Sequence, residues 1–314
     1  MPTRRRPLRL LCAVLALAAL ALGGCSDDGD EGGAGTTTAA GEGGEAGRGE
    51  GDEVVIDMKD YAFDVSGAAR AGTTTITMKN TGKELHMAAF GLLQPGKTLA
   101  DLQAAVTSED EAAFGQVLAE GDSPGTFLSP GAEERYTFAD LKAGTYGLMC
   151  FIPTAGEGVP HVVKGMLNTL VVEEGEAAGD VESDIDYAVS DGRTEGPTTL
   201  KAGTTTLKMT SSGAGPHELI VAKKKDPSVT YEQIDAAFDT LFESETPPPV
   251  GYADSLPAVI EGSTFDIEPR SSVALTLDLE PGTYLIGCAR EPDEEQEGPD
   301  ARAHTGELLE VTVT

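Results

Sequence analysis

Short runs rich in Val, Ile and Thr follow one another along most of the chain. Val54–Met58 and Thr74–Met78 are examples, and Gly, Asn or Pro residues bound such runs. β-Branched residues that partly alternate with polar positions over about five residues are typical of strands with one buried face. The pattern predicts an all-β structure built of short strands.

Two segments depart from this pattern and predict one short helix each. Ser108–Glu111 has the sequence of a capping box and is followed by spaced apolar residues. Thr230–Gln233 precedes Ile234, Phe238 and Leu241, which form an amphipathic stripe at helical spacing. We expect both helices to be loop insertions that cap one end of a β-sandwich.

Three motifs occur twice in the same order, which predicts a tandem duplication of one module. The pairs are Asp60–Phe63 with Asp186–Val189, Ala71–Thr75 with Ala202–Thr206, and Gly144–Tyr146 with Gly282–Tyr284. The predicted organisation is a first domain at residues 53–174, a linker at 175–182 and a second domain at 183–314.

Residues 1–24 have the features of an export signal. Arg4, Arg5, Arg6 and Arg9 precede the apolar stretch Leu10–Leu22, which is too short to span a membrane comfortably. The segment that ends in Cys25 resembles the lipobox of bacterial lipoproteins, which implies that Cys25 becomes a lipid-acylated first residue. An ordinary signal peptide with an incidental Cys is the alternative.

The following residues, 25–52, consist almost entirely of Gly, Ala, Thr, Asp, Glu and Ser. Such a composition buries too little apolar surface to fold, so we expect a disordered acidic tether. The resemblance and the tether together place the protein outside the cytoplasm, anchored to the cell membrane by an N-terminal lipid.

The chain carries a net charge of −31. Nucleic acid is excluded as a partner, because phosphate binding needs a basic surface. An acidic surface keeps a protein soluble and steers basic partners towards it. Both a purely solvating role and a steering role remain open.

Cysteine and histidine follow the same order in both copies. His86, Cys150 and His161 lie in the first copy, and His217, Cys288 and His304 lie in the second. An unpaired Cys is unusual in an oxidising compartment unless it has a chemical role. Either each Cys is a small buried hydrophobe beside ordinary histidines, or each set is a group of metal ligands.

The first set resembles the ligands of the cupredoxin family. His86 lies far upstream, Cys150 follows a predicted strand, and the segment Pro160–Met166 supplies His161 and Met166. This segment is especially similar to the type 1 domain of copper nitrite reductases. The resemblance implies a Greek-key β-sandwich and one copper ion bound by His86, Cys150, His161 and Met166.

Two imidazoles, a thiolate and a distant thioether suit copper that cycles between two oxidation states. The ten residues between Cys150 and His161 form a longer loop than in the small electron carriers of the family.

The second set departs further from the family pattern. Fifteen residues separate Cys288 from His304, six of these fifteen are acidic, and no Met stands at the axial position. His217, Cys288 and His304 are therefore a doubtful second metal site. We expect the second copy to bind copper weakly or not at all.

The function that these features predict is single-electron transfer by a membrane-tethered, extracytoplasmic copper protein. All four histidines are assigned to the two sets, so none remain for the further copper centres of a nitrite reductase or a multicopper oxidase, and we expect no enzyme activity. The alternatives are copper storage or delivery, and a metal-free binding module of the cell envelope. The sequence identifies neither the redox partner nor the envelope partner.

Overall fold

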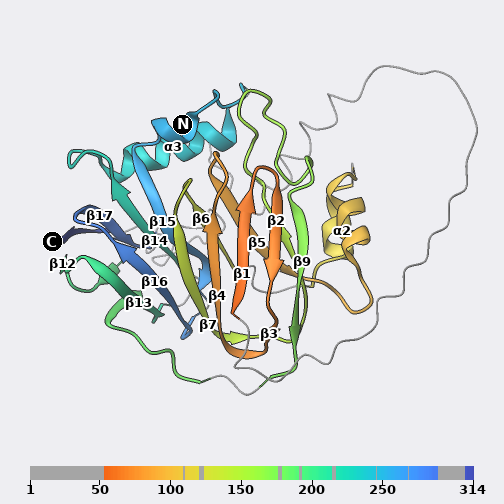
Figure 1. Ribbon diagram of the computed structural model, residues 1–314, viewed down its shortest axis with the longest axis horizontal. Coiled ribbons are helices and arrows are strands. Elements are labelled where there is room, and N and C mark those ends of the chain that lie inside the picture. Colours follow the sequence, from red (N-terminus) through yellow and green to blue (C-terminus); the bar gives the residue numbers. More distant parts are fainter. Residues whose placement is uncertain are drawn as a thin grey trace, which may run out of the picture.

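A computed structural model describes residues 53–108, 110–119, 124–175, 179–190, 193–213, 217–244, 246–267, 269–288 and 308–314. The chain is mainly β, as Figure 1 shows, and the predicted all-β class is confirmed. The expected signal peptide, the tether, Cys25 and His304 lie outside the described residues.

Residues 53–175, called the first half below, form the elements named first along the chain. They are β1 (Val54–Lys59), β2 (Ala62–Ser66), β3 (Ala69–Arg70), β4 (Gly72–Asn80), β5 (His86–Leu92), α2 (Leu99–Val106), the 3₁₀ helix η1 (Glu111–Gln116), β6 (Gly125–Leu128), β7 (Glu133–Leu141), β8 (Gly144–Met149) and β9 (Leu167–Glu173).

The described residues from 179 onwards, called the second half, form the remaining elements. They are β10 (Ile185–Ser190), β11 (Arg193–Glu195), β12 (Thr199–Leu200), β13 (Gly203–Ser211), β14 (His217–Lys224), α3 (Tyr231–Glu243), α4 (Tyr252–Ser255), β15 (Ala258–Ile267), β16 (Ser272–Leu279), β17 (Gly282–Gly287) and β18 (Leu308–Val313).

The strands form three sheets, and the largest is shared by the two halves. Its eight strands run β11-β10-β13-β16-β7-β4-β1-β2, so β7 of the first half pairs with β16 of the second. Each half adds a five-stranded sheet, β3-β9-β8-β5-β6 and β12-β18-β17-β14-β15. The pairing pattern is the same in both halves, with β1 parallel to β4 and β10 parallel to β13.

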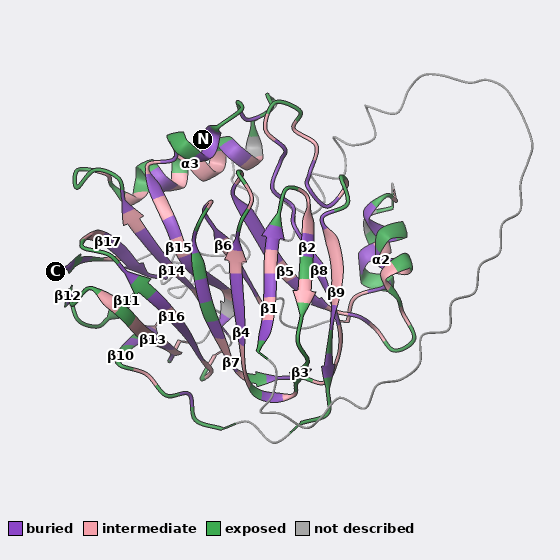
Figure 2. Ribbon diagram, viewed as in Figure 1, coloured by how far each residue is buried: buried purple, intermediate pink, exposed green. Residues whose placement is uncertain are grey.

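Buried residues occur along the strands of all three sheets, as Figure 2 shows. In β1 buried and less buried positions alternate, with Ile56 and Met58 fully buried. Phe90 of β5 meets Phe138 of β7 at 5.7 Å between ring centroids, so residues of the small and the large sheet touch across the sandwich. The alternating apolar residues of facing strands thus form one apolar layer between the small and the large sheet.

Two of the three repeated motifs occupy equivalent places. Gly72 and Gly203 begin β4 and β13, and Gly144 and Gly282 begin β8 and β17. The third pairing was wrong. Asp60–Phe63 spans the turn into β2, whereas the segment proposed as its copy lies within β10, which corresponds to β1. A shared Asp-Tyr-Ala sequence was too short to define the alignment.

The helix expected from Thr230–Gln233 is present as α3. The Thr230 amide donates to the Gln233 side chain at 3.0 Å, as in a capping box. The helix expected to begin at Ser108 was misplaced, because that region forms only the short η1. There Asp110 caps the amide of Ala112 at 3.0 Å.

The helix of the first half is α2, which the sequence analysis missed. Thr98 and Asp101 form its capping box, with Asp in the place of the usual Glu or Gln, so the motif did not stand out. Leu102 of α2 packs onto β8 where Gly147 leaves room, because a Cβ there would lie 2.3 Å from the leucine side chain.

The two halves are joined in both layers of the sandwich. Besides the pairing of β7 with β16, the Ser129 amide donates to the Ile260 carbonyl at 3.0 Å, and the Phe127 amide donates to the Ser263 hydroxyl at 2.7 Å. The Phe127 ring packs against Phe265 and against two phenylalanines of α3. The halves therefore share one continuous apolar core.

An acidic side chain lies buried at this junction. Glu134 of β7 is 1% exposed, and Gly262 of β15 leaves the space for its carboxyl group, since a Cβ there would lie 2.5 Å from Oε2. Burial raises the pKa of Glu134 to about 8, and the uncharged Thr126 and Ser263 offset only part of this effect. Glu134 is therefore neutral at pH 7 in the folded protein.

We expect Glu134→Gln to remove a pH dependence of folding. In the unfolded chain Glu134 ionises near the ordinary pKa of 4.5 for this side chain, whereas burial in the folded state keeps it protonated up to about pH 8. Wild-type stability should fall between these values by up to about 1.4 kcal/mol per pH unit from this group. Urea denaturation at pH 5, 6, 7 and 8 should show that the free energy of unfolding of the variant increases relative to that of the wild type as pH rises. A constant difference would contradict the assignment.

Candidate metal centre

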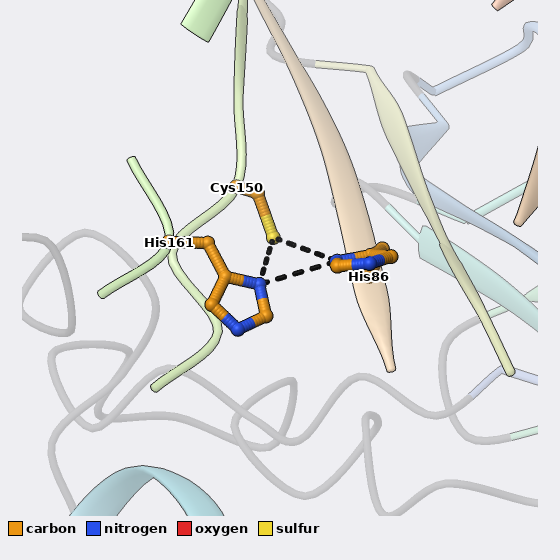
Figure 3. Close-up of side chains that lie close together, drawn as sticks. All are labelled: His86, Cys150 and His161. Atoms are coloured by element: carbon orange, nitrogen blue, oxygen red, sulfur yellow. Dashed lines mark hydrogen bonds between the residues drawn. The ribbon is translucent and has the colours of Figure 1, made fainter. Parts of the chain in front are cut away.

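Strand pairing in the first half brings two of the predicted ligands to one end of the sandwich. His86 is the first residue of β5, and Cys150 directly follows β8. These strands are antiparallel neighbours, with Ala89 opposite Met149. The start of β5 therefore meets the end of β8, and residues 64 positions apart in the chain become neighbours (Figure 3).

The loop after Cys150 folds back to add the third side chain. The His161 amide donates to the Ile152 carbonyl at 2.9 Å, and the Val162 amide donates to the Cys150 carbonyl at 2.7 Å. An isolated bridge between Pro153 and Pro160 closes the intervening residues. The long spacing is thus taken up by a small hairpin, and His161 returns to the position beside Cys150.

The three donor atoms converge in a closed site. Cys150 Sγ lies 4.0 Å from His86 Nδ1 and 3.4 Å from His161 Nδ1, and the two Nδ1 atoms are 3.2 Å apart. All three side chains are fully buried. In the described part of the chain, His86, Cys150 and His161 are the group of this kind whose donor atoms cluster tightly enough to hold a metal ion.

Met166, the expected axial ligand, belongs to the same loop. It is fully buried, and its amide donates to the His161 carbonyl at 2.9 Å. The turn from His161 to Met166 therefore keeps the thioether residue close in the fold to the histidine.

The Cys150 thiol lies in apolar surroundings with amide groups nearby. The Met87 amide donates to Cys150 Sγ at 3.3 Å. Burial raises the pKa of Cys150 to about 12, although the backbone of Met87 and Ile152 lowers it in part. The thiol keeps its proton at neutral pH unless a cation takes the proton's place, which is how metals bind cysteine.

Both imidazoles turn their other nitrogen to a carboxylate. His86 Nε2 lies 2.9 Å from Asp60 Oδ1, and His161 Nε2 lies 3.2 Å from Glu84 Oε2. Burial, followed by the neighbouring His161, lowers the pKa of His86 to about 4, so its ring is neutral at pH 7. A neutral ring that faces the cluster with Nδ1 can donate a lone pair to a metal.

Asp60 and Glu84 were not predicted from the sequence. In so acidic a chain a carboxylate two residues before His86, or one in a turn 26 residues before it, carries no signal of its own. Only the folded structure distinguishes these two acids from the others.

Glu84 is tied into a larger network. It accepts from the Tyr61 hydroxyl at 2.7 Å and from the Ala155 amide at 2.9 Å. Burial raises its pKa, but hydrogen bonds from His161, Tyr61 and Ala155 outweigh burial and hold the pKa at about 2. The centroids of the Tyr61 and His161 rings are 4.6 Å apart, and the Lys164 ammonium lies 4.5 Å from the centroid of the Tyr61 ring.

The second half contributes a cover to this centre. The Gly156 amide, in the loop before His161, donates to the Pro248 carbonyl at 2.6 Å. Tyr252 of α4 is buried, and its pKa is raised by burial first and then by Glu84 and Cys150, which places it among the groups around the site. A segment more than 80 residues away in the chain thus packs against the loop that leads to His161.

The equivalent place in the second half holds a histidine–cysteine pair. His217 begins β14 and Cys288 follows β17, with Nδ1 and Sγ 3.6 Å apart and both residues buried. The Glu218 amide donates to Cys288 Sγ at 3.5 Å, as the Met87 amide does to Cys150. The expected third member, His304, lies outside the described residues.

The donor set of the first half fits copper. Two imidazole nitrogens and one soft sulfur are the equatorial ligands of type 1 copper, and Met166 is buried in the same loop as His161. His86, Cys150 and His161 therefore form a cluster that can hold one copper ion.

Comparisons with known proteins find solved structures that are similar to this chain at low identity. Na-dithionite-reduced auracyanin from Roseiflexus castenholzii is 19% identical over 41% of this chain and 94% of its own, with a TM-score of 0.26. Auracyanin B is 20% identical over 43% of this chain and 93% of its own, with a TM-score of 0.26.

A copper-containing nitrite reductase from Thermus scotoductus SA-01 is 11% identical over 84% of this chain and 61% of its own, with a TM-score of 0.22. No family model matches the chain, and no curated protein matches it. Within the described residues, no helix combines the length and the apolar character needed to cross a bilayer.

We expect Gly82→Ala to disturb the contact between Asp60 and His86. A Cβ at Gly82 would lie 2.4 Å from Asp60 Oδ1 and 2.5 Å from His86 Nε2. Such overpacking should destabilise the protein by about 1–3 kcal/mol in urea denaturation. Gly115→Ala is the matched control, because nothing lies within 4 Å of the added carbon. Equal stability of the two variants would contradict this geometry.

Proposed function

We propose that the protein is a copper-binding electron carrier with one type 1 site, formed by His86, Cys150, His161 and Met166. The observation that carries the proposal is the convergence of two Nδ1 atoms on the Cys150 sulfur in a fully buried site. Copper bound there would exchange single electrons, with the soft thiolate favouring Cu(I) and the imidazoles accommodating both states.

The surroundings of the ligands support electron transfer over catalysis. His86 begins a paired strand, Cys150 accepts a backbone hydrogen bond, and His161 is held in a closed hairpin loop. Ligands fixed in this way move little when the charge of the metal changes. Since all three are fully buried, a substrate has no direct access to them, which favours a carrier over an enzyme.

The same burial is compatible with a second candidate, a module that stores or delivers copper. The observation that favours storage or delivery is the cover formed by the second half, since Pro248 and Tyr252 would hinder release of the metal. A storage protein should show no reversible one-electron couple, whereas the carrier should.

We expect one copper per chain, lost in Cys150→Ser and retained in Cys288→Ser. Cys150 belongs to a cluster of three donors, whereas the described part of the second half supplies only His217 and Cys288. Metal analysis after loading and dialysis gives the stoichiometry, and the wild type should have an intense visible thiolate-to-copper band. The Cys288→Ser variant should keep that band unchanged.

Two copper ions of similar affinity, one lost with each Cys variant, would show that the second half also forms a working site. A colourless wild-type protein that retains no copper would contradict the proposed function itself.

The proposal includes attachment to the outer face of the cell membrane through Cys25. Its support is the lipobox-like segment before Cys25 and the acidic residues that follow it. Cys25→Ala should move the protein from the membrane fraction to the soluble fraction of expressing cells, because the acyl chains are lost. Cys12→Ala, which changes the other N-terminal Cys, is the control. An unchanged membrane fraction in Cys25→Ala would contradict lipidation at this residue.

A further inference from the structure

Each proposed histidine ligand has its own carboxylate partner, and the fold positions both acids closely. Asp60 lies in the turn after β1, where the Lys83 amide donates to its two oxygens at 3.0 and 3.1 Å. Gly82 leaves the space in which Asp60 and the His86 ring meet. Asp60 is therefore directed at His86 Nε2 by the backbone.

The position of the Glu84 carboxylate is fixed as closely as that of Asp60. Its Oε1 accepts from the Tyr61 hydroxyl, and its Oε2 accepts from the Ala155 amide and faces His161 Nε2. Its side chain is only 13% exposed. With both oxygens engaged, Glu84 has one orientation relative to the His161 ring.

We propose that Asp60 and Glu84 are positioning residues that fix both ligand histidines with the proton on Nε2 and lower the reduction potential of the bound copper. This inference rests on the proposed function. A neutral imidazole carries one N–H, and a carboxylate acceptor at Nε2 keeps that proton there, so that Nδ1 offers its lone pair to the metal.

The charges of the two acids act in addition to their hydrogen bonds. Two carboxylates one ring away from the metal stabilise Cu(II) more than Cu(I), because the more highly charged ion gains more from nearby negative charge. The rings are fully buried, and the side chains of Glu84 and Asp60 are 13% and 26% exposed, so water screens Glu84 less than Asp60. The pair of acids should therefore favour the oxidised state.

Amide and alanine variants separate the two effects. In Glu84→Gln and Asp60→Asn an amide oxygen can still accept from Nε2, but the charge is lost, so the reduction potential should rise while the thiolate band remains. In Glu84→Ala and Asp60→Ala the acceptor is also lost, and copper affinity should fall about 10–100-fold.

Glu157 offers a matched control. It lies in the same loop as Ala155, is 59% exposed, and pairs with Lys164 at 2.9 Å rather than with a ligand histidine. Glu157→Gln removes the same charge close to the centre. Its potential should change much less than that of Glu84→Gln, and its copper affinity by less than about twofold.

The tautomer can be measured without copper. In metal-free wild-type protein with ¹⁵N-labelled histidine, NMR should show both His86 and His161 protonated at Nε2. Glu84→Ala should change the protonation pattern of His161 alone, and Asp60→Ala that of His86 alone. This readout also shows whether each variant is folded.

The inference is overturned if the Glu84 and Asp60 variants have the same reduction potential and copper affinity as Glu157→Gln while they are folded and show a normal thiolate band. The proposed copper site would still hold in that case. Nε2-protonated rings in both alanine variants would overturn the tautomer part directly. By contrast, a wild-type protein without any thiolate band contradicts the proposed function, so the two failures are distinguishable.

Discussion

Antiparallel pairing of β5 with β8 is the constraint on which the metal centre depends. The register that sets Ala89 opposite Met149 brings the start of one strand to the end of the other, and so His86 to Cys150. A shift of one residue would turn the alternate side chains to the other face of the sheet and separate the donors. Everything else at the centre, from the His161 hairpin to the carboxylates, is arranged around these two strand ends.

The sequence was sufficient for the fold class and for the grouping of His86, Cys150 and His161, because rare residue types in a fixed order stand out against an acidic background. The sequence was also sufficient for α3, because its capping box and its amphipathic stripe indicate the same helix. It was insufficient for Asp60 and Glu84, which are two acids among 53 and acquire a role only through contacts across the fold. The position of α2 was missed because its cap uses Asp101.

The two halves show how far the same pairing can be kept while the chemistry diverges. β14 and β17 repeat the arrangement of β5 and β8, and His217 meets Cys288 as His86 meets Cys150. The backbone donor to sulfur is also repeated. Strand register therefore fixes a histidine–cysteine pair in each half, whereas the third donor depends on a loop, and the loops of the two halves differ in length and charge.

The hydrogen bond from the Gly156 amide to the Pro248 carbonyl has a consequence for the order in which the centre closes. His86, Cys150 and His161 all precede Pro248 and Tyr252 in the chain, and the later segment supplies none of the three donor atoms. Docking of that segment therefore affects how fast an ion enters or leaves without changing which atoms hold it.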